Sequence, residues 1–354
     1  DVPHTEVMHK ASIVTANGAD FIIVGASYTM LKSRKPVVSV CAVRTGCGKS
    51  QTSREVLRIL RQLGKRVVAI RHPMPYGDLT RQVVQRFASY ADLDAGGCTI
   101  EEREEYEPVV AMGAVIYAGI DYEKVLRQAE EEADVIVWDG GNNDTPFYLP
   151  EVAIVVFDPH RAGHETAYHP GETNMLMADI AVINKVDSAD PAAVAAVRRT
   201  IAAHNPKADI VLADSALLVD APERIRGRRV LVVEDGPTVT HGDMPFGAGV
   251  IAARRFGAEA LVDPRPHLVG SLQETFAAYP RIGALLPAMG YGEGQVRDLE
   301  ATINTTPCDL VLSATPVDLT RLMSIAKPVV HIRYTYRDQD PATLKKALLR
   351  RLQV

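Results

Sequence analysis

The residues best suited to chemistry in this sequence are Lys49 and Ser50, which end the string VVSVCAVRTGCGKS at residues 37–50. An ammonium group neutralises phosphate charge, and a hydroxyl serves as a ligand of Mg²⁺. Gly46 and Gly48 let successive backbone N–H groups face one point, and the positive end of a following helix adds to the same field. This combination predicts a loop that cradles a nucleoside triphosphate together with Mg²⁺.

Two regular elements are expected to hold this loop. Residues 37–43 are mostly apolar and include several β-branched side chains, as in a central strand of a parallel sheet. Residues 52–63 carry apolar side chains at helical spacing, and Gly64 is placed to end that helix. We assign nucleotide binding to the whole loop and its first helical residues, which are Thr45, Gly46, Cys47, Gly48, Lys49, Ser50 and Gln51.

The loop departs from the usual spacing G-x-x-x-x-G-K-[ST], because Val43 replaces the first glycine and Arg44 follows it. It resembles the deviant class of phosphate loops found in dethiobiotin synthetases, nitrogenase iron proteins and nickel-insertion GTPases. In much of that class an extra basic residue reaches a phosphate, often across a dimer. The resemblance implies that Arg44 acts with Lys49 on the transferring phosphoryl group and that a homodimer is possible. A glycine turn that merely precedes Lys-Ser is the alternative.

Asp139 directly follows residues 134–138 (DVIVW), which are expected to form a strand. A carboxylate at the end of a strand beside a phosphate loop is where a further acid for Mg²⁺ is expected. We therefore assign Ser50 and Asp139 to the metal and also count Asp139 as catalytic, beside Lys49 and Arg44.

A second polar group follows the predicted strand at residues 179–183 and comprises Asn184, Lys185 and Asp187. It resembles the N-K-x-D motif with which GTPases recognise the base. An asparagine also pairs with the N6 and N7 edge of adenine. The group therefore predicts contact with a nucleotide base, and we expect ATP. A helix-capping asparagine followed by a surface aspartate is the alternative.

Two Pro- and Gly-rich loops, at residues 71–78 and 158–174, leave predicted strand ends and carry cationic side chains. We expect them to bind a small anionic phosphorylated substrate through Arg71, His72, Arg161 and His164. The histidines of the second loop are also a possible metal site, through His160, His164 and His169. The acidic run at residues 101–107 is expected to be a solvated helix face, with an acidic edge that helps to hold Mg²⁺ as the alternative.

Alternating strand and helix patterns predict an α/β fold. We expect a doubly wound, mostly parallel sheet like that of phosphate-loop NTPases, followed by further α/β units. A helix is expected at residues 79–90, and later strands near residues 229–233, 259–262, 282–286, 309–312 and 328–332. We predict a phosphate-loop nucleotide-binding domain at residues 36–226 and a carboxy-terminal α/β domain at residues 227–354. Residues 1–35 are expected to be the tail of a preceding domain or an extra strand, and the apolar run at residues 21–24 would form that strand.

Composition narrows the class of protein. The chain has 354 residues, 47% of them hydrophobic and 23% charged, which is ordinary for a globular protein. The net charge of −5 argues against nucleic acid as the main partner. Its four cysteines form no C-x-x-C pair, which fits a reducing cytoplasm. There is no apolar run of about 18 residues and no visible signal peptide. We expect a cytoplasmic protein without a membrane partner and, since it begins at Asp1 rather than Met, a longer natural chain.

Several long strings resemble the cyclic 2,3-diphosphoglycerate synthetases. They lie at residues 41–52 (CAVRTGCGKSQT), 71–79 (RHPMPYGDL), 138–144 (WDGGNND), 158–165, 184–187 and 234–238 (EDGPT). The resemblance implies an ATP- and Mg²⁺-dependent closure of 2,3-diphosphoglycerate into an internal phosphoanhydride, with release of ADP and phosphate. It also implies a domain before the phosphate loop. The alternatives are a regulatory or metal-delivering GTPase and a nucleotide sensor without catalysis.

Overall fold

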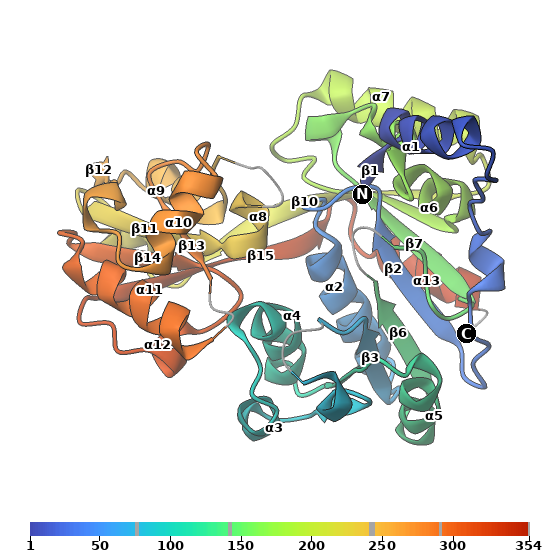
Figure 1. The fold of residues 1–354 in the computed structure, drawn as a ribbon, viewed down its shortest axis with the longest axis horizontal. Coiled ribbons are helices and arrows are strands. Elements are labelled where there is room, and N and C mark those ends of the chain that lie inside the picture. The colour runs from blue at the N-terminus through green and yellow to red at the C-terminus, as the bar shows by residue number, and fades with distance from the viewer. Residues whose placement is uncertain (75–77, 141–143, 241–244, 290–291, 353–354) are drawn as a thin grey trace. The chain divides into compact units, whose positions relative to one another are not determined.

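The computed structural model describes the chain except for residues 75–77, 141–143, 241–244, 290–291 and 353–354 (Figure 1). The described chain forms two compact units. The first unit contains residues 1–88, 114–216 and 336–354, and the second contains residues 89–113 and 217–335. This division differs from the predicted contiguous domains at 36–226 and 227–354. Residues 89–113 interrupt the first unit in sequence but belong to the second. One reason is that Ile100, from this segment, is part of the hydrophobic core of the second unit.

The first unit has a sheet in the order β10-β9-β7-β2-β6-β3-β5-β4. Within the described residues of this sheet, neighbouring strands pair in parallel, except that β4 is antiparallel to β5. The predicted doubly wound, mostly parallel sheet is therefore confirmed. Its strands are β2 (Val37–Ala42), β3 (Val67–Arg71), β4 (Gln85–Phe87), β5 (Val115–Ala118), β6 (Val135–Asp139), β7 (Val152–Phe157), β9 (Ile180–Ile183) and β10 (Asp209–Val219).

The amphipathic pattern expected after the phosphate loop is present. In the helix after the phosphate loop, Val56, Leu57 and Leu60 are buried. The carboxylate of Asp190 accepts from the N–H of Ala192 and so caps the helix that begins at Pro191. The helices are α2 (Lys49–Gln62), α5 (Tyr122–Glu132), α6 (Gly171–Met177), α7 (Pro191–His204) and α13 (Thr343–Leu352).

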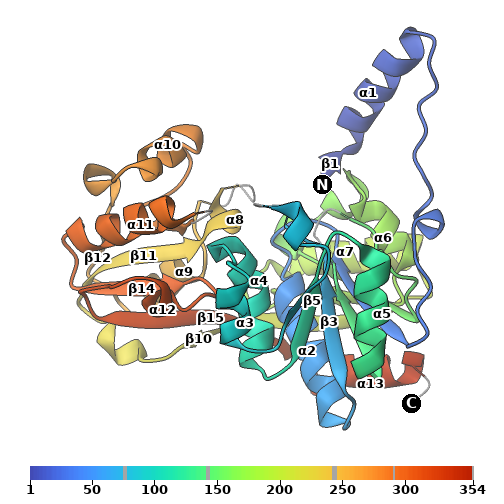
Figure 2. The same cartoon turned by 60° about the horizontal axis from the view of Figure 1, so that its bottom comes forward.

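The amino-terminal segment differs from expectation. Strand β1 (Val2–Pro3) pairs with β8 (Tyr168–His169), and α1 (His4–Ala16) follows it. Figure 2 shows α1 extending away from the sheet of the first unit, with the chain running back beside it. The strand expected at residues 21–24 is wrong. These four side chains are 37–78% exposed and belong to no strand. A short run of apolar residues was therefore not enough to predict a strand.

The strands of the second unit pair in parallel in the order β12-β11-β14-β15, with β13 also paired to β11. Its strands are β11 (Arg229–Asp235), β12 (Ala260–Leu261), β13 (Leu286–Ala288), β14 (Leu310–Ala314) and β15 (Val329–Asp338). They lie at or next to the five predicted positions. Its helices are α3 (Tyr90–Ala95), α4 (Ile100–Ala111), α8 (Gly236–Val239), α9 (Ala248–Arg255), α10 (Ser271–Ala278), α11 (Glu293–Thr305) and α12 (Leu319–Leu322).

Two local predictions are wrong. The helix expected at residues 79–90 is instead a short 3₁₀ turn, the antiparallel strand β4 and the start of α3. Asp78 caps the turn and Ser89 begins a capping box, so the chain is interrupted twice. The acidic run at 101–107 is helical, but it is not a solvated face, because most of its charged side chains are buried. These are Glu101, Glu102, Arg103, Glu104 and Glu107.

Candidate functional site

The phosphate loop has the predicted strand–loop–helix form. It follows β2, and α2 begins at Lys49. Gly46 and Gly48 adopt positive φ angles of 82° and 101°, a region that side-chain-bearing residues rarely occupy. A Cβ on Gly48 would lie 2.0 Å from Nδ2 of Asn184. Glycine is therefore required at this position both by the backbone conformation and by the neighbouring side chain.

A buried ion pair lies at the end of the loop. Nζ of Lys49 is 2.6 Å from Oδ1 of Asp139, and both side chains are at most 5% exposed. The hydroxyl of Ser53 donates to the same oxygen at 2.6 Å. Burial by itself raises the pKa of Asp139, but Lys49, Arg71 and these hydrogen bonds outweigh it and lower that pKa to about 2. Asp139 is consequently ionised at neutral pH.

Ser53 is a member of the site that sequence reasoning missed. Its signal is its position one helical turn after Lys49 on α2, which places both side chains on one face. Arg71, predicted to bind substrate, is 4% exposed and lies beside Asp139 instead of on an open surface. Its Nη1 is 3.5 Å from Oδ2 of Asp139 and 3.4 Å from the carbonyl oxygen of Gly140. Nδ1 of His72 lies 3.3 Å from the carbonyl oxygen of Pro73.

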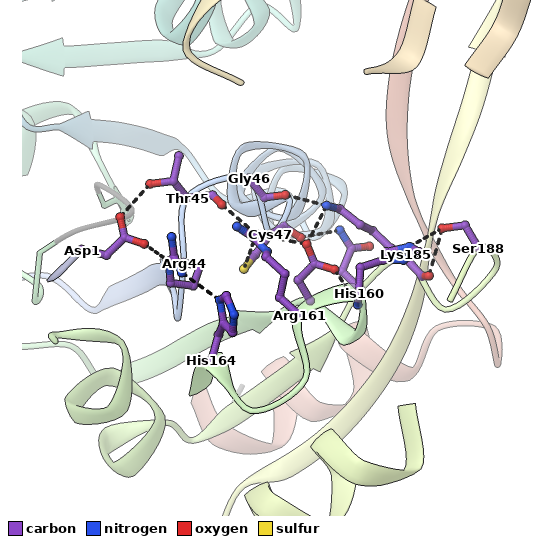
Figure 3. Close-up of polar contacts among 12 residues, drawn as sticks. Asp1, Arg44, Thr45, Gly46, Cys47, His160, Arg161, His164, Lys185 and Ser188 are labelled. Carbon is purple, nitrogen blue, oxygen red and sulfur yellow. Dashed lines mark hydrogen bonds and ion pairs between the residues drawn. The ribbon is translucent and has the colours of Figure 1, made fainter. Parts of the chain in front are cut away.

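The N-K-x-D group contacts the phosphate loop from β9. Nδ2 of Asn184 donates to the carbonyl oxygen of Cys47 at 2.9 Å. Nζ of Lys185 donates to the carbonyl oxygen of Gly46 at 2.7 Å (Figure 3). Oδ1 of Asn184 is buried and has no hydrogen-bond partner within the described ranges. The group thus supports the loop backbone, and its contact with a base stays a prediction.

Two further residues predicted to bind the nucleotide, Asp187 and Gln51, contact Ser215, which lies within β10. Oδ1 of Asp187 accepts from the N–H of Ser215 at 3.1 Å. Nε2 of Gln51 donates to the hydroxyl of Ser215 at 2.9 Å. Ser215 therefore joins two residues that the sequence had assigned separately to the nucleotide. Ser50 is the second residue of α2 and is partly exposed.

Arg161 extends the cationic surroundings of the loop. Its Nη2 donates to the carbonyl oxygen of Thr45 at 2.7 Å and to Oδ2 of Asp158 at 3.1 Å. The same carboxylate oxygen accepts from Lys185 at 2.8 Å. Burial raises the pKa of Asp158, but Lys185 and Arg161 together lower it below its usual range. The loop at 158–174 therefore reaches the phosphate loop.

Arg44 is held by residues of its own chain. Its Nη1 lies 2.8 Å from Nδ1 of His164 (Figure 3). Its guanidinium carbon is 3.6 Å from the centre of the Tyr168 ring. Its Nε contacts the carboxylate of Asp1. Burial and the charge of Arg44 lower the pKa of His164, so a neutral imidazole can accept from the guanidinium. Asp1 and Tyr168 were missed, and no local pattern marks them.

The three histidines of the 158–174 loop do not assemble into a metal site. The ring of His160 pairs with the hydroxyl of Ser188 at 3.0 Å, whereas His164 faces Arg44. Within the part of the chain that the structure describes, no three His, Cys, Asp or Glu side chains are arranged to hold a metal ion. None of the helices in those same ranges combines the length and apolar character that a membrane span requires.

Comparison with known proteins then identifies the family. No family model matches the chain. Arginine synthetase ArcE of Thermococcus kodakarensis is 58% identical over 348 residues, which are 98% of this chain and 78% of the relative. This chain belongs to the family of that synthetase. It is an enzyme, and the predicted class of ATP-dependent synthetase is confirmed. The relative is named for arginine synthesis and not for cyclic 2,3-diphosphoglycerate.

A solved structure shows how far the fold is shared. LpxK from Aquifex aeolicus, described as in complex with ATP, aligns with a TM-score of 0.57 at 13% sequence identity. The alignment covers 98% of this chain and 97% of LpxK. At this identity the likeness concerns the fold alone.

Proposed function

We propose that this protein forms the guanidinium group of arginine at the expense of ATP. The observation that carries the proposal is the 58% identity with arginine synthetase over nearly the whole chain. The buried pair of Lys49 and Asp139 supports it, since this pair lies where a phosphate loop acts on the transferring phosphoryl group.

The chemistry follows from the product. A guanidinium group is a ureido group whose oxygen has been replaced by nitrogen. Transfer of the γ-phosphoryl group of ATP to the ureido oxygen of citrulline releases ADP and turns that oxygen into part of a leaving group. Ammonia then attacks the ureido carbon, the C–O bond breaks, and phosphate leaves with the oxygen and takes up the proton that ammonia loses. Arginine, ADP and phosphate are the products.

The loop residues have distinct roles in this proposal. Lys49 supplies positive charge to the β- and γ-phosphates, and the backbone N–H groups of the loop donate to their oxygens. Asp139 is kept ionised by Lys49 and Arg71, so its carboxylate suits a hard cation. Ser50 and Asp139 would hold Mg²⁺, which supplies further neutralisation of the triphosphate. We expect ATP in preference to GTP, with Asn184, Lys185 and Asp187 nearest the base.

A second candidate is the internal phosphoanhydride of 2,3-diphosphoglycerate. The extra cations around the loop, Arg44 and Arg161, favour an acceptor that carries phosphate groups. In this alternative Arg71, His72, Arg161 and His164 bind the substrate phosphates. A GTPase that acts as a switch is a third outcome, and it would turn over GTP without any acceptor.

One experiment separates these outcomes. The full chain with Mg²⁺ is given ATP or GTP and either citrulline with ammonium, 2,3-diphosphoglycerate or no acceptor, and nucleotide products are quantified. Citrulline labelled with ¹⁸O in its ureido group should pass the label to phosphate, because the C–O bond breaks. Turnover with ATP that depends on citrulline and ammonium, with labelled phosphate, is expected. Turnover only with 2,3-diphosphoglycerate, or without an acceptor, would overturn the proposal.

A further inference from the structure

In the first unit, β10 continues past the end of its neighbour β9, whose last residue, Ile183, pairs with Leu212. Just beyond that pair, the N–H of Val186 donates to the carbonyl oxygen of Ala213 at 3.0 Å. On the other side of β10, the N–H of Gln339 donates to the carbonyl oxygen of Leu212 at 3.0 Å. Ligands of such sheets bind outside the carboxyl ends of the strands. The chain around Gln339 therefore lies at the ligand edge, across β10 from the N-K-x-D group.

A buried carboxylate on β10 fixes an exposed arginine from this segment. Nε and Nη2 of Arg337 donate to Oδ2 of Asp214 at 3.2 and 2.7 Å. Nε2 of Gln339 donates to the other oxygen, Oδ1 of Asp214, at 2.5 Å. The side chain of Asp214 is 7% exposed, whereas that of Arg337 is 63% exposed. One edge of the guanidinium group is thus fixed, while much of the side chain stays open to a ligand.

The order of the strands places Arg337 at the nucleoside end of a bound nucleotide. β6, which carries Asp139, neighbours β2 on one side, whereas β9 and β10 lie on the other side of β2. The phosphates and Mg²⁺ are proposed at the loop and at Asp139, so the base should lie toward β9 and β10. The hydrogen bond to Asp214 and, to a smaller extent, the charge of Asp187 raise the pKa of Arg337. Arg337 is therefore near the carboxylate that we expect beside the base.

We infer that Arg337 stacks its guanidinium group on a face of the nucleotide base, with Asp214 holding the plane of that group. The inference rests on the proposed function, since it names a residue that holds the base of the nucleotide used there. A guanidinium group is planar, and its charge is attracted to the face of an aromatic ring. Polar groups such as those of the N-K-x-D residues read the edges of a base. A stacked arginine instead adds affinity for any purine.

The same strand offers a matched control. Arg350 is 66% exposed and pairs with Asp209 at 2.5 Å. Asp209 is the first residue of β10, so this pair lies at the amino end of the strand, away from the edge where ligands bind. Exposed ion pairs contribute little to stability. We therefore expect both Arg337→Ala and Arg350→Ala to fold, and Arg350→Ala to bind nucleotides like the parent protein.

The test measures binding to the full chain by calorimetry in the presence of Mg²⁺. The probes are ADP, inosine diphosphate, which changes an edge of the purine but keeps its face, and pyrophosphate, which lacks the nucleoside. Arg337→Ala should weaken binding of both nucleotides by the same factor, about 10-fold for a stacked cation. It should leave pyrophosphate binding unchanged. Arg337→Lys keeps the charge but loses the planar group, so it should not fully restore ADP binding.

Several results would overturn the inference. An unchanged affinity of Arg337→Ala for ADP would reduce Arg337 to a surface ion pair. An equal loss for pyrophosphate would mean that it acts on the phosphates, and unequal losses for the two nucleotides would mean that it reads an edge of the base.

Failure of the inference and failure of the proposed function give different results. Arginine formation by Arg337→Ala with an unchanged KM for ATP overturns the inference and leaves the proposed function standing. The expected loss of ADP binding in Arg337→Ala, with a parent protein that forms no arginine, supports the inference and counts against the proposed function.

Discussion

Replacing Asp139 by asparagine should strongly destabilise the protein, because it removes the charge that compensates two buried cations. Lys49 is 1% exposed and lies 2.6 Å from the carboxylate, and Arg71 is 4% exposed at 3.5 Å. Breaking a buried pair by removing one partner costs about 3–5 kcal/mol, since the other charge stays in a poorly solvating environment. We expect the free energy of unfolding of Asp139→Asn to fall by that amount.

Urea denaturation at pH 7 measures this loss, with Asp134→Asn as a matched control. Asp134 precedes the same strand and pairs with Arg66, but that pair is exposed and should contribute little. Adding Lys49→Met to Asp139→Asn should restore part of the stability, because the uncompensated ammonium is gone. A loss no larger than that of the control, or no recovery in the double variant, would refute the reasoning.

The same pair predicts how stability depends on acid. The pKa of Asp139 is lowered to about 2 in the folded chain, from an ordinary value of 3.8. The ionised carboxylate of Asp139 therefore makes its full contribution to the free energy of unfolding above about pH 4, and this contribution is lost as the pH falls through about 2. Thermal unfolding between pH 2 and 6 should show a steeper loss for the parent protein than for Asp139→Asn. Parallel curves would contradict this origin of acid sensitivity.

Three further predictions concern the loop. Gly48→Ala should abolish ATP binding measured by calorimetry, because the new Cβ would lie 2.0 Å from Nδ2 of Asn184 and the φ angle of Gly48 is 101°. A near-normal affinity would show that the loop can change its conformation to accept alanine. Lys49→Ala should abolish ADP formation while the circular dichroism spectrum is unchanged, and retained turnover would remove Lys49 from the mechanism. Arg44→Ala should slow ADP formation roughly 10³-fold if Arg44 acts as an arginine finger, and an unchanged rate would leave it only its contacts with Asp1, His164 and Tyr168.

The parts of the fold that could be predicted are those encoded by adjacent residues. The strand, glycine loop and helix around Lys49 follow from local hydrophobicity and backbone freedom. The shared edge of Asp139, Arg161 and Asn184 follows from the rule that parallel strands end on one side of a sheet. The structure confirms that these three lie at or beside the phosphate loop.

Features that depend on distant partners could not be predicted. The acidic helix α4 has the composition of a solvated surface, yet Glu104 is buried because Thr315 and Asp235 meet it from strands more than a hundred residues away. Asp1 approaches Arg44 because β1 pairs with β8, a pairing of two residues without a sequence signature. The roles of the predicted site residues remain predictions for the experiments above.

The carbonyl contacts under the phosphate loop have a consequence for nucleotide affinity. The carbonyl oxygens of Thr45, Gly46 and Cys47 each accept from a side chain, from Arg161, Lys185 and Asn184 in turn. In a trans peptide the carbonyl and the next N–H point in opposite directions. Anchoring the carbonyls of Thr45 and Cys47 therefore turns the N–H groups of the two loop glycines toward the other side before any nucleotide arrives. Less conformational entropy is then lost on binding, so these three side chains help to set the nucleotide affinity through the loop backbone.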